Sequence, residues 1–254
     1  MRILWTFCVY NEIELLPFKI DYIKKNDIDC YVFDNMSTDG SWDWLQENKI
    51  PSQRFDSDGM FDLKLNISLM AKKIHELKPD WAMFPGCDTF YVHRENKTLR
   101  EVIEEADRNS FSAINSAYRT LIFYYTGREK PGIDPRLNYV FYNTRKILHE
   151  KCIAKYCPTL VVIADHFVFK GKKVMRNNDF FVLHYSLRHD SEKRKTEEYI
   201  RRKKAWDSGL TPRRWGHHYK KIVQDGKFSY NSSTLFDIRN STLWESIKNS
   251  VLNG

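Results

Sequence analysis

The stretch YVFDNMSTDGSWDWL, residues 31–45, contains the change from strand to helix that decides the fold class. Its first three residues are bulky β-formers and predict a buried strand. Asp34 then places a carboxylate at the carboxyl end of that strand, where open α/β sheets bind ligands in a crevice. Residues 37–39 suit a helix N-cap, and apolar side chains follow at helical spacing. An ordinary strand-to-helix turn with a capping Asp explains the same residues, so the stretch alone leaves both interpretations open.

Strand and helix signals alternate through the N-terminal half of the chain. Strands are predicted at 2–9, 29–34, 53–55 and 81–84, and helices at 12–25, 40–48, 62–78 and 98–107. This order predicts an α/β fold with a mostly parallel central sheet, right-handed crossovers and flanking helices. From about residue 111 strand signals dominate, and the chain from 191 to about 206 has helical character. No repeat or low-complexity linker interrupts the 254 residues, so we expect one domain with a C-terminal extension.

The formal net charge of +8 is concentrated late in the chain, in KGKKVMR (170–176) and in residues 192–215. Basic surfaces attract nucleic acid, anionic lipid or phosphorylated small molecules. Charges of both signs alternate over residues 192–206, which is typical of a solvated helix face. The pattern is too diffuse for a nucleic-acid-binding motif, so no specific nucleic acid is expected.

The cysteines and the apolar segments indicate a cytoplasmic setting. Five cysteines, an odd number without CxxC spacing, argue against a disulfide framework and against a zinc ribbon. No apolar run reaches the roughly 18 residues of a membrane span. The opening segment RILWTFCVY is followed at once by acidic residues and no small-residue cleavage site, so we interpret it as the first strand. Contact with a membrane surface through basic side chains stays open.

Four segments in order carry a family resemblance. They are CVYNE (8–12), FDNMSTDGS (33–41), FDLKLNISLMAKK (61–73) and DWAMFPGCDTFYV (80–92). Together they resemble family 2-like glycosyltransferases with the GT-A fold, of the nucleotide-diphospho-sugar transferase superfamily. Segments 152–168 and 183–199 are also similar to that family. The resemblance covers residues 1–205, which would form the GT-A domain, whereas the basic extension 206–254 matches no motif.

The resemblance implies a set of contacts to a nucleotide-sugar donor. Asp34 would accept hydrogen bonds from the base, which favours a UDP-sugar. The backbone of Val9 and residue Asn11 would lie beside the base, although Asn11 and Glu12 also suit the start of the first helix. The remaining candidates are Asp58 for the ribose or base, Lys64 and Asn66 for the diphosphate, and Arg188 for a phosphate.

The acidic turn FPGCDTF, residues 84–90, departs from the family pattern. The first expected Asp falls on Gly86 and the expected Glu on Thr89, so that only Asp88 remains. A carboxylate pair normally holds Mg²⁺ or Mn²⁺ against the diphosphate. The best additional ligand is His184, which would favour Mn²⁺ through its imidazole nitrogen. A core histidine explains His184 equally well.

The resemblance therefore implies an enzyme that transfers a sugar to a glycan or lipid-linked glycan, with inversion. Inversion needs a general base near the acceptor hydroxyl, and Asp165 or His166 lies at a suitable place in the family order. Either residue also suits a structural role. The alternative is a non-catalytic GT-A-like protein that binds nucleotide or glycan and has a degenerate metal motif.

Overall fold

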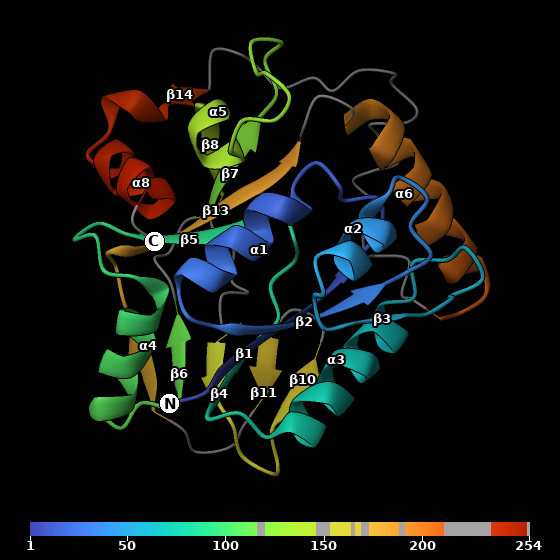
Figure 1. The fold of residues 1–254 in the computed structure, drawn as a ribbon, viewed down its shortest axis with the longest axis horizontal. Coiled ribbons are helices and arrows are strands. Elements are labelled where there is room, and N and C mark those ends of the chain that lie inside the picture. The colour runs from blue at the N-terminus through green and yellow to red at the C-terminus, as the bar shows by residue number, and fades with distance from the viewer. Residues whose placement is uncertain are drawn as a thin grey trace.

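The centre of the fold is a seven-stranded, mostly parallel sheet (Figure 1). The computed structural model describes residues 1–115, 120–145, 153–163, 166–168, 173–187, 191–210 and 235–252. Across the sheet the strands are β12 (Val174–Arg176), β6 (Ala113–Asn115), β9 (Ile153–Lys155), β4 (Trp81–Met83), β1 (Ile3–Val9), β2 (Asp29–Asp34) and β3 (Ser52–Arg54). Only β9 runs antiparallel to its neighbours, β4 and β6. The predicted fold class, α/β with a mostly parallel sheet flanked by helices, is confirmed.

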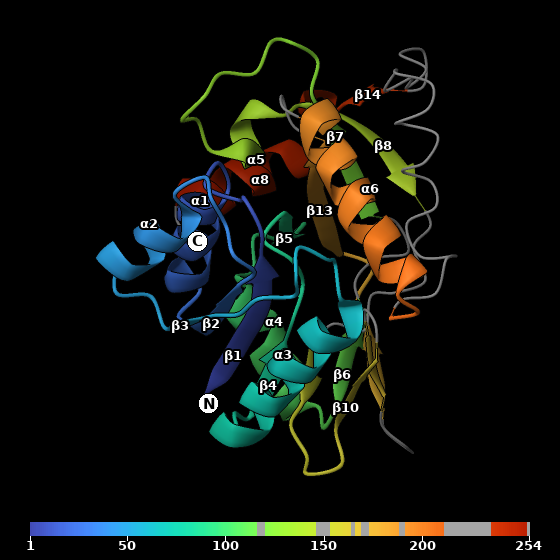
Figure 2. The same ribbon diagram turned by 90° about the vertical axis from the view of Figure 1, so that its right-hand side faces the viewer.

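Helices cover both faces of this sheet, because β1 alternates between two hydrophobic clusters. Trp5 and Phe7 pack with α1 (Leu16–Lys25), α2 (Ser41–Glu47) and α4 (Leu99–Arg108). Leu4 points to the opposite face, where α3 (Leu63–Leu77) supplies Met70 and Ile74. Figure 2 shows α1 and α3 on opposite sides of β1. Each fully buried large side chain contributes roughly 1.5–3 kcal/mol, so this alternation fixes the register of the central strands.

A second, five-stranded sheet stands beside the first. Its order is β14 (Phe236–Asp237), β8 (Phe141–Arg145), β7 (Thr120–Tyr124), β13 (Phe180–Leu187) and β5 (Thr89–His93). The chain enters it directly from β4 through the acidic turn. The hairpin of β10 (Val161–Ile163) and β11 (His166–Val168) pairs separately. The helix α6 (Ser191–Asp207) follows β13 and lies beside this sheet (Figure 2).

Helix α8 (Leu243–Leu252), near the end of the chain, is bound to α5 (Pro135–Asn138) by a buried arginine. Arg136, in α5, has no exposed surface and pairs with Asp134 at 2.8 Å. Its Nη1 also donates to the carbonyl of Ser250 at 2.8 Å, in α8. The short 3₁₀ turn Ile238–Asn240 leads from β14 toward α8. Part of the segment predicted as an extension is therefore held to the domain by a buried guanidinium.

The start of the first helix differs from the prediction. Helix α1 begins at Leu16 rather than at residue 12, and Leu15 is its N-cap without a side-chain hydrogen bond. Pro17 in the first turn explains this start, since its fixed φ and missing N–H suit that position. Asn11 has a φ of 54°, in the left-handed region, so the chain turns there before any helix forms. Asn11 and Glu12 are therefore not its caps.

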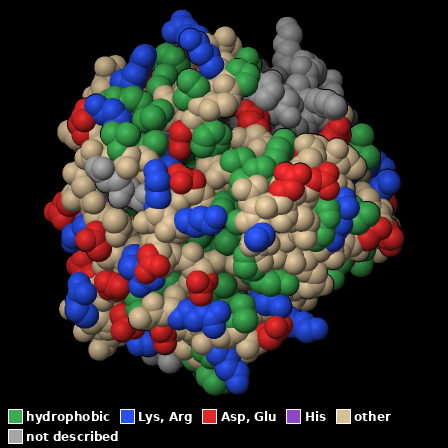
Figure 3. Space-filling view, viewed as in Figure 1, with side chains coloured by type: hydrophobic (Ala, Val, Ile, Leu, Met, Phe, Trp, Pro, Cys, Tyr) green, Lys and Arg blue, Asp and Glu red, His purple; other side chains and the backbone are tan. Residues whose placement is uncertain are grey.

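The visible surface is mixed in charge. Figure 3 shows Lys and Arg side chains interspersed with Asp and Glu over the face it presents. Among the described residues, no helix combines the length and the apolar character that crossing a bilayer needs.

We predict that Arg136→Met lowers the free energy of unfolding by about 3 kcal/mol, because removing one partner of a buried ion pair leaves the other uncompensated. Urea unfolding measures the loss. Arg94→Met is the matched control: its partner is Asp179 at 2.9 Å, both side chains are 40% or more exposed, and such pairs contribute at most about 1 kcal/mol. Equal losses in the two variants would contradict the assigned role of Arg136.

Candidate functional site

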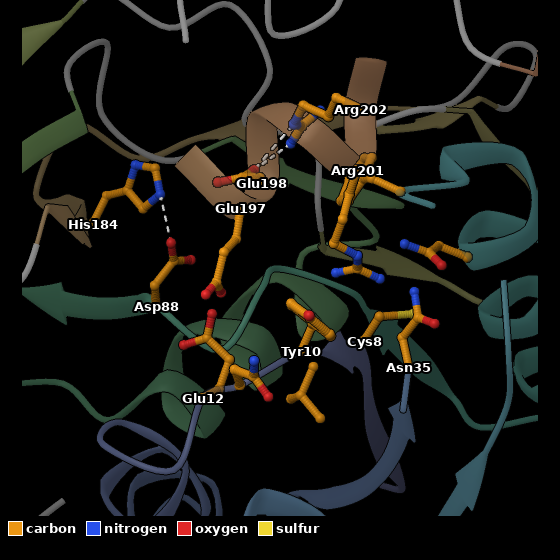
Figure 4. Close-up of a pocket in the computed structure, with 14 residues that line it drawn as sticks. Cys8, Tyr10, Glu12, Asn35, Asp88, His184, Glu197, Glu198, Arg201 and Arg202 are labelled. Carbon is orange, nitrogen blue, oxygen red and sulfur yellow. Dashed lines mark hydrogen bonds and ion pairs between the residues drawn. The ribbon is translucent and has the colours of Figure 1, made fainter. Parts of the chain in front are cut away.

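A pocket of about 270 Å³ opens at the carboxyl ends of β1 and β2 (Figure 4). Residues 8–12 and Asn35 line one side, where these two parallel strands end. Asp88, His184 and residues from α6 line the other side. The crevice beyond the carboxyl ends of parallel strands is where open α/β sheets bind ligands. The volume is close to the lower limit for small-molecule sites.

The loop after β1 is held by hydrogen bonds with residues 37–39, which follow β2. The Ser37 hydroxyl accepts from the backbone N–H of Asn11 at 3.0 Å, and Asp39 accepts from the N–H of Ile13 at 2.9 Å. In return, the Asn11 side chain accepts from the N–H of Thr38 at 2.8 Å. The N-cap of α2 is instead Gly40, with a φ of 92° and no side-chain cap. The predicted capping role is therefore confirmed only for Asp39, whose Oδ1 accepts from the N–H of Ser41, the first residue of α2, at 2.9 Å. Ser37 and Thr38 instead join two loops at the pocket's edge.

Asp34 ends β2 with its side chain fully buried. Its Oδ1 accepts from the backbone N–H of Ser37 at 3.1 Å and lies 3.3 Å from Nε of Arg54. Its Oδ2 has no hydrogen-bond partner. The neighbouring residues Val9 and Asn35 line the pocket. Asp34 is thus adjacent to the pocket and retains one unused acceptor, and its contact with a base stays a prediction.

Two core side chains, Trp5 and Lys19, donate hydrogen bonds to backbone carbonyls of the acidic turn. Trp5 Nε1 donates to the carbonyl of Pro85 at 2.8 Å, and the Lys19 amine donates to the carbonyl of Thr89. Lys19 is fully buried, and its Nζ lies 3.4 Å from the centroid of the Trp5 ring. The two carbonyls lie on either side of Asp88. The orientation of Asp88 therefore depends on this contact between Lys19 and Trp5.

Strand pairing brings His184 to Asp88. Strands β13 and β5 are antiparallel, with His184 opposite Thr89, and the N–H of Tyr185 donates to the carbonyl of Asp88 at 2.8 Å. His184 Nε2 consequently lies 3.1 Å from Asp88 Oδ2 (Figure 4). Both residues line the pocket. The structure thus brings together the two residues predicted as metal ligands.

The helix α6 covers the pocket from the side opposite the strand ends. Its Arg201 lies with the guanidinium carbon 3.5 Å from the centroid of the Tyr10 ring. Its Arg202 pairs with Glu198 at 2.6 Å, one turn earlier. Glu197 also lines the pocket, and Figure 4 shows its carboxylate pointing toward that of Glu12. The pocket therefore has carboxylates near Asp88 and a guanidinium at its other end.

The other predicted donor contacts divide into two groups. Asn66 lines the pocket, is only 6% exposed, and its Oδ1 has no hydrogen-bond partner. Val9 and Asn11 line the pocket as well. Lys64 and Asp58 are exposed and are not among the lining residues. The backbone N–H of Asp58 donates to the Asp56 side chain at 2.7 Å, as in an ordinary polar turn.

Three predicted residues cannot be placed in the site. Asp165 and Arg188 lie outside the described residues. The backbone of His166 lies in β11, and its side chain is likewise outside the described part of the structure. Their assignments as general base or phosphate ligand stay predictions.

The residues that α6 contributes to the pocket were not predicted from the sequence. The alternating charges of residues 192–206 favoured a solvated face, yet Arg201 is only 7% exposed. A usable signal existed in the i, i+4 spacing of Glu197 with Arg201 and of Glu198 with Arg202, which places all four on one stretch of helix surface. Tyr10 and Phe61, whose rings contact these arginines, could be assigned only once the pocket was known.

Several solved structures are similar to this chain at low sequence identity. Residues 1–349 of TarS from S. aureus are 13% identical, with a TM-score of 0.46 over 88% of this chain and 69% of that one. The same protein in complex with UDP-GlcNAc gives 13% identity and a TM-score of 0.45, over 89% and 71%. Glucosyl-3-phosphoglycerate synthase from Mycobacterium tuberculosis, in complex with Mn²⁺, UDP and glucosyl-3-phosphoglycerate, gives 15% and 0.32, over 50% and 45%. No family model matches the sequence, and no curated protein matches it.

We predict that Lys19 makes the free energy of unfolding rise with pH in the alkaline range. Burial lowers the pKa of Lys19 well below its ordinary value. Between that lowered pKa and the unfolded value of about 10.4, the unfolded chain binds the extra proton, so the free energy of unfolding rises with pH in this window. Lys19→Met removes this contribution. The difference between wild type and variant, from urea unfolding at a series of pH values, should therefore grow as pH rises.

The control for this prediction is Lys72→Met, since Lys72 is exposed on α3. Its difference from wild type should be flat over the same pH range. A flat difference for Lys19→Met as well would contradict the assigned burial of its amine.

Proposed function

We propose that this chain is a glycosyltransferase that moves a sugar from a nucleotide-diphosphate donor, a UDP-sugar, to a glycan or lipid-linked acceptor with inversion. One observation carries the proposal: three of the eight buried side-chain atoms without partners among the described residues lie in or beside a pocket at the carboxyl ends of parallel strands. They are Oδ2 of Asp34, Oδ1 of Asn66 and Nε of Arg201. Each buried unpaired group costs about 1–3 kcal/mol, which a ligand that supplies the partner restores. The family resemblance of the sequence names such a ligand.

A nucleotide supplies the missing partners. A pyrimidine base such as uracil has an N–H donor between two carbonyl acceptors, and ribose has hydroxyls that both donate and accept. The free acceptor of Asp34 suits the base N–H, in keeping with its place at the end of β2. The side-chain amide of Asn66 suits a hydroxyl or the polar edge of a base. These pairings support a nucleotide with a pyrimidine base.

Asp88 and His184 suit a divalent cation as part of its coordination shell. A carboxylate oxygen and an imidazole nitrogen 3.1 Å apart are a donor pair that Mn²⁺ accepts. The described residues contain no group of three or more His, Cys, Asp or Glu side chains placed to hold a metal. The diphosphate would therefore complete the shell. When bound, the cation would neutralise charge on the leaving diphosphate.

The rest of the reaction falls to the protein's own groups. The acceptor hydroxyl must lose its proton as it attacks the anomeric carbon, and Asp165 and His166 remain the proposed bases. The Asp88 turn, held by Lys19 and Trp5, keeps the leaving group's surroundings fixed during the transfer. Helix α6 covers the pocket and limits the access of water, which would otherwise compete with the acceptor.

A binding protein without catalysis is the second candidate. It is favoured by Gly86, which leaves the turn with one carboxylate where the resembling family has two. Such a protein would bind the nucleotide or glycan in the same pocket without turnover. Assays of binding and of turnover on the same preparation separate the two functions.

We predict that a UDP-sugar stabilises the protein in a thermal-shift screen, and more strongly with Mn²⁺ present. Ligand at about 100 times its Kd adds about 2.7 kcal/mol of stability. Asp88→Asn should lower sugar transfer by at least about 100-fold, because the loss of charge stabilisation in the transition state amounts to several kcal/mol. Asp43→Asn, on the exposed side of α2, is the control and should transfer normally.

The outcomes of this experiment separate the alternatives. Transfer that survives both EDTA and Asp88→Asn would contradict the metal-assisted mechanism and leave a metal-independent transferase. Nucleotide binding without turnover of any donor would identify the binding protein. No stabilisation by any nucleotide would contradict both.

We also predict that Gly86→Ala slows transfer, although it adds no charge. A Cβ at Gly86 would lie 3.1 Å from Asp88 Oδ1, so the carboxylate must move away from its present place. Misplacement of a positioned group costs up to about 100-fold in rate. Initial rates with saturating donor measure the effect. An unchanged rate would show that the orientation of Asp88 is not critical.

A further inference from the structure

Arg201 is a buried cation that forms no ion pair with a carboxylate among the described residues, although the charges of Glu198 and Glu197 act on it. It is only 7% exposed, in the middle of α6. Among the described residues its guanidinium has one hydrogen-bond partner, the carbonyl of Met60, which accepts from Nη2 at 3.0 Å. Its Nε has no partner, and no ion pair with it occurs among the described residues. A guanidinium has five N–H donors, so most of its hydrogen-bonding capacity is unused.

Arg202, the next residue on the helix, is neutralised by an ion pair and provides a comparison. Arg202 donates from both Nε and Nη2 to Glu198, at 3.1 and 2.6 Å. Arg201 has instead the ring of Tyr10, 3.5 Å away. A ring face attracts a cation by roughly 0.5–2 kcal/mol, less than the several kcal/mol that desolvating an ion costs. Burial accordingly lowers the pKa of Arg201.

Hydrogen bonds to both the backbone and the side chain of Arg201 fix its position. The backbone N–H of Phe61 donates to the carbonyl of Arg201 at 3.2 Å, while its Nη2 binds the carbonyl of Met60. The Met60 carbonyl also accepts from the Ser57 hydroxyl at 2.5 Å. A guanidinium held in this way loses little further freedom on binding a ligand, so binding there is favoured.

The surroundings point to an oxyanion as the missing partner. Arg201 lines the same pocket as residues 8–12 and Asn66, so its unused N–H donors belong to a side chain at the site. In Figure 4 Asp88 and Glu12 lie at the other end of the pocket, away from Arg201. A phosphate group supplies both the negative charge and the acceptor oxygens that a guanidinium binds in a fork.

We propose that Arg201 binds a phosphate oxyanion of the substrate. The inference deepens the proposed function and rests on it for the identity of the molecule that carries the phosphate. The donor's diphosphate and a phosphorylated acceptor are the two sources of this chemistry. Binding of the phosphate neutralises the buried guanidinium and fills its free donors, and it ties α6 to the strand ends through the ligand.

The test is calorimetric titration of UDP, uridine and inorganic pyrophosphate into the full chain and two variants. Arg201→Met removes the guanidinium, and Lys203→Met is the matched control, since Lys203 lies exposed on α6 and pairs with Asp207. We expect Arg201→Met to weaken UDP about 10- to 100-fold, as for the loss of charged hydrogen bonds, while uridine binding is unchanged. Circular dichroism and the melting temperature verify that each variant is folded. Arg201→Lys, which keeps the charge without the fork, should be intermediate and serves where Arg201→Met does not fold.

Each result decides one point. If Arg201→Met binds UDP as wild type does but no longer binds pyrophosphate at saturating UDP, the phosphate site is supported. The site then belongs to the acceptor. Equal weakening of UDP and uridine overturns the proposal, because Arg201 would then contact the nucleoside. Unchanged binding of UDP and pyrophosphate overturns it as well. Arg201-dependent binding of pyrophosphate by a protein that binds no nucleotide would sustain the phosphate site and contradict the proposed transferase.

Discussion

The contact between Lys19 and Trp5 is the constraint on which the candidate site depends. The two side chains meet in the core with 3.4 Å between Nζ and the ring centroid, and each donates to a carbonyl of the acidic turn. That turn is also where the chain leaves the central sheet and enters the second one. A single buried contact therefore fixes both the direction of Asp88 and the junction of two sheets. A buried amine is costly, and its retention here is consistent with a need for a rigid turn.

The pocket combines parts that folding brings together from distant places in the chain. Strand ends supply Asn35 and residues 8–12, antiparallel pairing supplies His184, and helix α6 supplies Arg201. The result is a gradient of charge, with carboxylates near Asp88 and a buried guanidinium opposite. A cation suits the first end and a phosphate suits the second. A diphosphate held between them would be attracted at both ends, which gives it a defined direction in the pocket.

The sequence predicted the elements that rest on local patterns and missed those that rest on distant contacts. β2 matches its predicted bounds, and α3 and α4 match within one residue, because apolar periodicity and caps such as the Thr98–Glu101 capping box are local signals. The start of α1 was predicted too early: Pro17 marks the true first turn locally, and the distant contacts of Ser37 and Asp39 hold the preceding residues in a loop. Arg201 was missed because its burial arises from Tyr10 and Met60, more than 100 residues away.

Gly86, which stands where the resembling family has an Asp, affects the packing around Asp88 as well as the number of metal ligands. The position lies so close to Asp88 that even a methyl group would crowd the carboxylate at 3.1 Å. A side chain at this position would therefore require the Asp88 carboxylate to shift by a few tenths of an ångström from its contact with His184, in a turn held by Lys19 and Trp5. Restoring the second Asp of the resembling family would disturb the first one. The single carboxylate and the imidazole thus belong to one geometry, in which the substrate's own oxygens must provide what the turn lacks.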